Sequence, residues 1–190
     1  MVRSFFDGSG NRIIFGIGKD SLEKLPTRGR KEKEIASYIL NRWDVYKDFN
    51  ISARSMATPV DRVNAMIELA GLIQNYGRKF MNAAKSGDAT ILLELLEQDF
   101  PVNAREPATS FTALHHTAAH SSEDAVSVLV WREDIDLLKR DGFGRLASEL
   151  AGRFGENLEL SRRLRMLEAA QAQERGITLT YRPRPPATED

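Results

Sequence analysis

The chain has 190 residues, which is enough for one or two domains with a buried core. Its 27 lysines and arginines balance 27 aspartates and glutamates, so no net charge attracts it to nucleic acid or to a membrane surface. The absence of cysteine excludes disulfides, thiol catalysis and cysteine-ligated zinc. No apolar run has the length of a signal peptide core or of a membrane span, so we expect a soluble, cytoplasmic protein.

The start of the chain predicts a β-hairpin. Two β-prone runs, residues 2–6 and 12–17, flank a bend rich in glycine, aspartate and asparagine. Residues 16–21 invite a phosphate-loop interpretation, but Ile13 stands where that loop needs its first glycine, and Asp20 stands where it needs serine or threonine. We therefore expect the end of a strand, followed by a helix capped by Asp20 or Ser21.

Residues 27–34 are polar and carry charges of both signs, which favours a solvated helix start over a basic binding patch. The apolar positions Ile35, Ile39 and Tyr46 continue at helical spacing, and they predict a single amphipathic helix that ends near Phe49.

A second helix is predicted to begin near Pro59, because Thr58 and Asp61 stand at capping-box spacing and proline suits the first turn. We expect Gly77 to end it. Its apolar stripe is interpreted as core and contains Val63, Ile67, Ala70 and Ile73.

Residues 112–130 carry the most informative pattern of the chain. Small and apolar residues recur at helical spacing over 112–120, Ser121 and Ser122 interrupt them, and a second apolar stripe follows over 125–130. This predicts a short helix, a turn and another helix. The stretch resembles an ankyrin repeat, whose opening reads T-P-L-H-x-A, with Ala113 at the position of the usual proline.

The same unit recurs on both sides of this stretch. Ala84, Ala118 and Gly152 follow one another at equal intervals, and the turn positions 87, 121 and 155 keep the same interval. This interval is one position longer than the usual period of ankyrin arrays, so a single extra loop position accounts for the difference. The resemblance covers roughly residues 78–168.

The resemblance implies a mainly α fold, a short ankyrin-like helical solenoid of about three repeats. The N-terminal third resembles no known family; because so few repeats need cover, we expect its β-hairpin and helices to pack as a cap. We expect an N-terminal region at 1–77, repeats at 78–175 and a flexible proline-rich tail at 176–190, which includes an extended arm at 177–181 and is a weak candidate for a proline-rich ligand. The repeats are expected to end in a capping helix that buries Leu160, Leu164 and Leu167 and exposes Glu159, Arg162, Arg163 and Arg165.

All three histidines lie in the central repeat. His116 and His120 share a helical face and suggest a metal site, but no third ligand is evident. The resemblance instead assigns to His115 structural hydrogen bonds between neighbouring loops, and it turns His116 and His120 toward the concave side. No nucleophile with a base and no catalytic pair of carboxylates is recognisable, so we expect no enzyme, metal or cofactor.

The resemblance implies protein–protein interaction through the concave face and the projecting loops, 105–111 and 139–143, as in an adaptor, inhibitor or regulator. Phe111 and Phe143 are the expected anchors, unless they only fasten each loop to the next repeat. The expected contact residues are Arg105, Glu106, Ser110, Phe111, His116, His120, Lys139, Arg140 and Phe143. In the alternative, residues 1–77 are the functional part, as a binding domain or an unrecognised enzyme, and the repeats are a docking arm. The identity of the partner protein, the oligomeric state and delivery into a host cell stay open.

Overall fold

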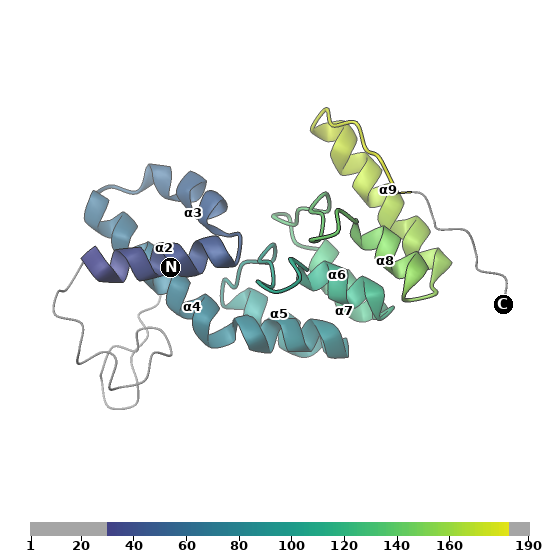
Figure 1. Ribbon diagram of the computed structural model, residues 1–190, viewed down its shortest axis with the longest axis horizontal. Helices are drawn as coiled ribbons and strands as arrows, with labels where there is room; N and C mark the ends of the chain where they lie inside the picture. Colours follow the sequence, from purple (N-terminus) through teal and green to yellow (C-terminus); the bar gives the residue numbers. More distant parts are fainter. Residues whose placement is uncertain (1–29, 183–190) are drawn as a thin grey trace.

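The computed structural model describes residues 30–182, with side chains from residue 32 onward (Figure 1). Within this range the protein is mainly α, with eight α-helices, one 3-10 turn and no strand. The helices are α2 (Arg30–Arg42), α3 (Tyr46–Ser52), α4 (Pro59–Ser86), α5 (Ala89–Glu97), α6 (Ala113–Ala119), α7 (Glu123–Val130), α8 (Ala147–Arg153) and α9 (Leu158–Glu174), and the 3-10 turn η1 is Ala53–Ser55. The hairpin expected at 2–17, the capped helix at 20–21 and the tail beyond residue 182 lie outside the described residues.

The single helix expected to run to Phe49 is two helices. Asp44 has a φ of 56°, in the left-handed region, and it ends the continuous helix after α2. The prediction was wrong here because the apolar spacing continues across the break: Ala36, Leu40 and Val45 are all buried in the same core. Periodicity alone does not reveal a turn that preserves the buried face.

Helix α4 begins as expected and ends later than expected. The Thr58 hydroxyl accepts a hydrogen bond from the Asp61 backbone N–H at 3.1 Å, and Pro59 occupies the first turn. The helix then continues through Gly77 for 28 residues and ends at Gly87, which is left-handed with a φ of 74°. It therefore crosses the boundary expected after residue 77.

Gly77 has a packing role inside α4. A Cβ atom at this position would lie 2.7 Å from Cη2 of Trp43, a distance that real Cβ contacts do not reach. The indole of Trp43 thus lies directly against the backbone of α4, where α2 packs on α4. Glycine permits this close approach at a cost of about 1 kcal/mol in helix propensity relative to alanine.

The helices beyond α4 pack as successive pairs. The partners are α4 with α5, α6 with α7, and α8 with α9, and α6 packs between α4 and α8 while α5 packs on α7. Figure 1 shows them in a row from α2 to α9. The short helices start where the sequence supplies caps: Asp88, Thr112 and Asn157 accept from backbone N–H groups of α5, α6 and α9.

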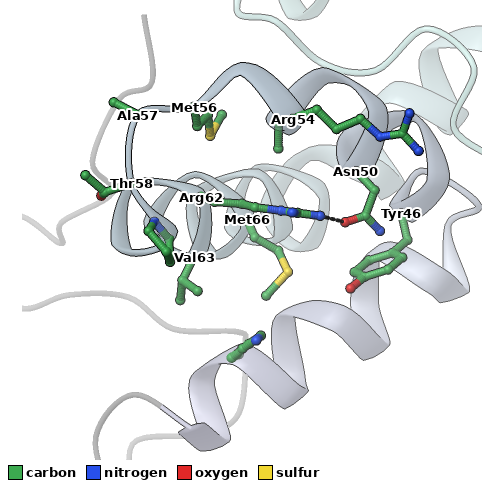
Figure 2. A pocket seen from close by; sticks show the side chains of 12 residues that line it. Tyr46, Asn50, Arg54, Met56, Ala57, Thr58, Arg62, Val63 and Met66 are labelled. Atoms are coloured by element: carbon green, nitrogen blue, oxygen red, sulfur yellow. Dashed lines mark hydrogen bonds between the residues drawn. The ribbon is translucent and has the colours of Figure 1, made fainter.

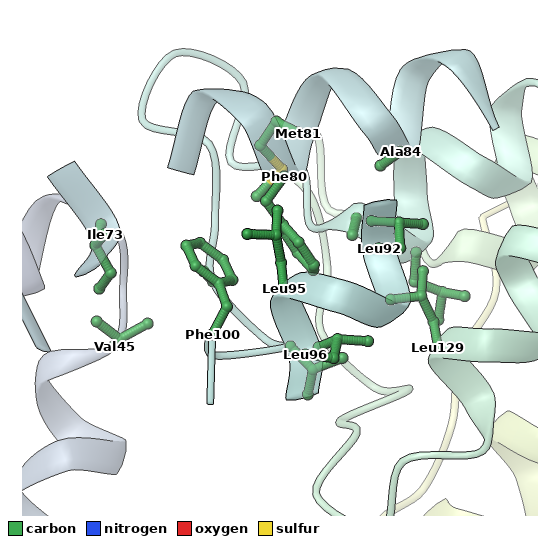
Figure 3. Close-up of a cluster of buried hydrophobic side chains, with 14 of the residues drawn as sticks. Val45, Ile73, Phe80, Met81, Ala84, Leu92, Leu95, Leu96, Phe100 and Leu129 are labelled. Carbon is green, nitrogen blue, oxygen red and sulfur yellow. The ribbon is translucent and has the colours of Figure 1, made fainter. Parts of the chain in front are cut away.

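A continuous apolar core runs through these pairs. The rings of Phe80 in α4 and Phe100 after α5 lie with centroids 4.4 Å apart. Leu95 and Leu96 of α5 and Leu129 of α7 are buried beside them (Figure 3). Because α5 buries leucines toward both α4 and α7, neither neighbouring pair can be removed without exposing this core.

Polar side chains link the connecting segments of consecutive pairs. The Asn103 amide donates to the Asp134 carbonyl at 2.6 Å and accepts from the Asp136 N–H at 2.7 Å. The Gln171 amide of α9 binds the same segment from the other side, at 2.9 and 2.8 Å to the backbone of residues 135 and 137. These bonds fix the segment between α7 and α8 to both of its neighbours.

The last helix has the expected faces and one unexpected residue. Leu160 and Leu164 are buried and Leu167 is partly buried, while the charged residues Glu159, Arg162, Arg163 and Arg165 are exposed, as predicted. Glu168 is fully buried on the apolar side.

Within residues 30–182, no helix combines the length and the apolar character that a membrane span requires.

Candidate protein-binding surface

The loop 105–111 is a closed turn built on Glu106. The Glu106 N–H donates to the Phe111 carbonyl at 2.7 Å, and the Ser110 N–H donates to the Glu106 carbonyl at 2.8 Å. Ser110 is left-handed, with a φ of 58°. The Thr109 hydroxyl also donates to Glu106 Oε2 at 2.9 Å. The loop therefore holds Phe111 in a fixed position at its end.

The Glu106 carboxylate fastens this loop to two helices. It lies 2.7 Å from Lys85 Nζ of α4 and 3.3 Å from His116 Nε2 of α6. Burial opposes ionisation of Glu106, but hydrogen bonds from Lys85 and then Thr109 outweigh it and hold the pKa below its ordinary value. Burial lowers the pKa of His116 to about 4, more than the nearby carboxylate raises it. The contact at neutral pH is consequently a hydrogen bond from a neutral imidazole rather than an ion pair.

The resemblance placed His116 on the open, concave side. This expectation is wrong, because the His116 side chain is only 8% exposed. The ring lies 4.9 Å from the Phe111 ring, centroid to centroid, and Glu106 closes the other side. His120, one turn later, is exposed. Among residues 30–182, no three histidine or carboxylate side chains come together as a potential metal site.

His115 forms the inter-loop hydrogen bonds that the resemblance implied. Its Nδ1 accepts from the Thr112 backbone N–H at 3.2 Å, and its Nε2 lies 3.2 Å from the Arg145 carbonyl, to which it donates in this tautomer. Burial lowers the pKa of His115 to about 4, which keeps the ring neutral. The start of α6 is thereby tied to the start of α8.

The second loop is organised by the buried carboxylate of Asp141. It accepts from the backbone N–H groups of Phe143 and Arg145 at 2.9 and 2.8 Å. Its other oxygen lies 2.7 Å from both Nε and Nη2 of Arg145. Gly144 supplies the left-handed residue of the turn, with a φ of 76°. This network places Phe143 at the tip, 64% exposed.

The two loops contact each other directly. The Gly142 N–H donates to the Thr109 carbonyl at 3.1 Å. A Cβ atom on Gly142 would lie 2.9 Å from that carbonyl oxygen, so the approach requires glycine. The loops therefore form one continuous surface along the row of helices.

An aromatic patch, defined as Phe143, Phe154 and the Arg145 guanidinium between them, is the most exposed apolar feature of this surface. The guanidinium carbon lies 4.7 Å from the Phe143 ring centroid and 5.2 Å from that of Phe154. Phe154, at the end of α8, is 55% exposed. The Phe111 ring lies 5.9 Å below the same cation and is only partly exposed. Of the two expected anchors, Phe143 is accessible and Phe111 supports it.

The cations among the expected contact residues are held in internal contacts. Arg105 Nε and Lys139 Nζ each lie 3.1 Å from Oδ2 of Asp44, in the turn between α2 and α3. The Arg105 contact lacks hydrogen-bond geometry and is an ion pair only. Arg105 Nη2 also donates to the Arg140 carbonyl at 2.6 Å. These side chains connect the N-terminal helices to both loops.

Arg140 is likewise engaged. Its guanidinium donates to the Gly144 carbonyl at 2.8 Å and to the Thr180 carbonyl at 2.6 Å. The sequence does not reveal these contacts, because both acceptors are backbone carbonyls, which every residue carries, and Thr180 is distant along the chain.

Sequence reasoning missed Asp44, Arg145 and Phe154. The sequence did contain a signal for Arg145. The spacing Asp141-Gly142-x-Gly144 predicts a turn in which the aspartate carboxylate accepts hydrogen bonds from the backbone N–H groups that follow it. Phe154 directly precedes Gly155, where an exposed turn is expected, so a phenylalanine there is unusual. Asp44 gave no signal, because it falls within a helical pattern.

This surface presents two exposed rings, a guanidinium held by Asp141 and loops fixed by internal hydrogen bonds. Neither a family model nor a curated protein matches the sequence of the chain.

Proposed function

We propose that the chain is a protein-binding module, in which a short ankyrin-type stack of helix pairs holds a partner protein on its loops and concave face. Hydrogen bonds between residues about one repeat apart support the proposal of such a stack. The Ser121 hydroxyl donates to the Gly155 carbonyl at 2.8 Å, across a separation of 34 residues. The amides of Asn103 and Gln171 bind backbone groups 31 to 36 residues away. Contacts at a nearly constant separation are those expected of repeats that touch only their neighbours.

The single observation that carries the binding role is the aromatic patch. Phe143 and Phe154 are both more than half exposed, although they lie on rigid supports. Exposed aromatic rings that are fixed in place lose little conformational entropy on binding, and such rings dominate the energy of many interfaces. Arg145 is held by Asp141 in the same way, so it also presents a preformed contact.

On this proposal the chain is a cytoplasmic adaptor, inhibitor or regulator and not an enzyme. The cations Arg105, Lys139 and Arg140 contribute to the shape of the loops rather than directly to capture. The exposed His120 and the loop residue Ser110 border the surface at α6.

The experiment compares two exposed aromatic regions in the native cell. A photo-crosslinking phenylalanine analogue at position 143 should give a discrete covalent adduct with one protein, and Phe154→Ala should reduce its yield at least tenfold. Trp131, 86% exposed after α7, provides the matched control. Trp131→Ala should leave the adduct unchanged. An adduct that survives Phe154→Ala but disappears with Trp131→Ala would contradict the proposed surface.

A second candidate places a function in the N-terminal helices, with the repeats as a docking arm. A pocket bounded by α2, α3, η1 and α4 favours it. Its chemistry is distinct from that of the aromatic patch.

A further inference from the structure

A pocket of about 440 Å³ lies between α2, the α3–η1 segment and the first turns of α4 (Figure 2). This volume is in the range of pockets that bind small molecules. None of its walls belongs to the aromatic patch. The lining residues are Lys33, Tyr46, Asn50, Ala53, Arg54, Met56, Ala57, Thr58, Pro59, Arg62, Val63 and Met66.

The charged residues that line the pocket all have one sign. Lys33, Arg54 and Arg62 come from three different elements, and no aspartate or glutamate is among the lining residues. Within residues 30–182, none of these three cations forms an ion pair with a carboxylate. In a chain with equal numbers of acidic and basic residues, this concentration of positive charge favours an anion.

Polar groups of α3 and α4 are already arranged around this charge. The Arg62 guanidinium donates to the Asn50 amide oxygen, and Figure 2 shows this bond running across the pocket. The Asn50 amide also hydrogen-bonds Tyr46, and this bond, followed by that of Ser37, lowers the pKa of the Tyr46 phenol below its ordinary value. The charges of Arg62 and Lys33 lower this pKa further, which indicates a positive potential at the pocket.

Apart from Thr58, the remaining lining residues are apolar. Ala53 and Met66 are buried, and Val63 and Met56 are partly buried beside them. A purely ionic ligand such as free phosphate would leave the partly exposed carbons of Met56 and Val63 in contact with water. A ligand with an apolar body would cover them and gain roughly 25 cal/mol for each Å² removed from water.

We propose that this pocket binds an amphiphilic anion, a phosphate or carboxylate head group on a short alkyl or aryl body. The head group contacts the Arg62 guanidinium, and the charges of Lys33 and Arg54 add to the attraction. The body lies on Met56, Val63 and Met66. The pocket is independent of the aromatic patch, so this proposal stands or fails separately from the protein-binding role.

The test is calorimetric titration of the full chain with octyl phosphate and octanoate below their micellar concentrations. Saturable one-to-one binding of at least one of them is expected, and comparing the two distinguishes a phosphate from a carboxylate head group. Inorganic phosphate and neutral octyl glucoside should each bind at least tenfold more weakly, because each lacks one half of the required chemistry.

Arg54→Gln should weaken binding about threefold, because it removes one of the positive charges that line the pocket. Arg54 forms no hydrogen bond or ion pair with the described residues, so its loss should leave the melting temperature unchanged. Arg78→Gln, on the exposed side of α4, is the matched control and should bind like the unmodified chain. No saturable binding of either anion, equal binding of octyl glucoside, or equal weakening by Arg78→Gln would overturn the proposal.

Discussion

The Glu149 carboxylate accepts a hydrogen bond from the Arg182 backbone N–H at 2.7 Å, and its second oxygen accepts from the Leu146 N–H at 2.7 Å. His115 forms the corresponding pair of contacts one unit earlier, to the backbone N–H that precedes its own helix and to the Arg145 carbonyl. Glutamate therefore takes the place of histidine where the group to be bound is an N–H rather than a carbonyl. The C-terminal segment lies beside α8 as the loop before α8 lies beside α6.

Further contacts hold this segment, residues 177–182, which contains the arm expected at 177–181 and forms no strand. The Arg140 guanidinium donates to the Thr180 carbonyl at 2.6 Å. The Tyr181 ring centroid lies 4.8 Å from the guanidinium carbon of Arg165 on α9. The arm thus closes the end of the row of helices, where no further helix pair follows in the described residues.

The first prediction concerns Glu149. Glu149→Ala should destabilise the protein by about 1–3 kcal/mol, because two backbone N–H groups lose their acceptor. Hydrogen exchange of the Arg182 amide should accelerate at least tenfold, and urea denaturation measures the stability. Glu174→Ala, at an exposed site on α9, should change neither. Unaltered exchange at Arg182 would mean that Glu149 does not hold the arm.

The second prediction concerns the contact of Gly77 with Trp43. Gly77→Ala should destabilise the protein, since the clash at 2.7 Å costs about 1–3 kcal/mol and exceeds the gain of about 1 kcal/mol in helix propensity. The sign should reverse in a Trp43→Ala background, where the added methyl group has room. A double-mutant cycle in urea measures both values. Stabilisation by Gly77→Ala in the unmodified background would show that the indole does not need the glycine.

These two sites illustrate how far the sequence predicts the fold. Helix starts were predictable wherever a short polar side chain precedes an apolar stripe, as at Thr58 and Thr112, because capping depends on residues three positions apart. Gly77 was misinterpreted as a helix end. Local propensity disfavours glycine inside a helix, and only the position of Trp43, which lies in a different helix, explains it.

The candidate site was predictable in part for the same reason. The tip position of Phe143 follows from a local turn signal around Asp141. The burial of His116 was not predictable, since it depends on how Phe111 and Glu106 fold back over α6. Whether a side chain on a loop faces solvent is decided by such non-local contacts, which a single sequence does not specify.

The third prediction is a loss of stability on acidification caused by buried histidines. Burial lowers the pKa of His115 and His116 from about 6.5 to about 4. As the pH falls, these histidines therefore bind protons in the unfolded chain before they do so in the folded chain. The stability that each neutral ring contributes is complete above pH 6.5 and is lost as the pH falls toward 4. His115→Asn should reduce the change in the free energy of unfolding between pH 7 and pH 5 by about 2 kcal/mol, measured by urea denaturation.

The control for this prediction is His120→Asn, because His120 is exposed and its replacement should leave the pH profile unchanged. The comparison with the unmodified chain is essential, since Glu168 titrates in the opposite direction over the same range. If His115→Asn and His120→Asn have the same profile, the neutral buried ring is not the cause.

The fourth prediction concerns the fully buried Glu168 of α9. Burial raises its pKa to about 7, against hydrogen bonds from the Ser148 N–H and hydroxyl at 3.0 and 2.7 Å. The folded state thus holds the proton more tightly than the unfolded state, so the stabilisation is complete below the unfolded pKa and is lost as the pH rises through about 7. Between pH 6 and 8 the unmodified chain should therefore gain about 1 kcal/mol less stability in urea denaturation than Glu168→Gln, which stays neutral at that position while the histidines titrate as before. Glu174→Gln, at an exposed position of the same helix, should have the pH profile of the unmodified chain. If Glu168→Gln also has that profile, another group titrates, because no ionisable carboxyl remains at that position.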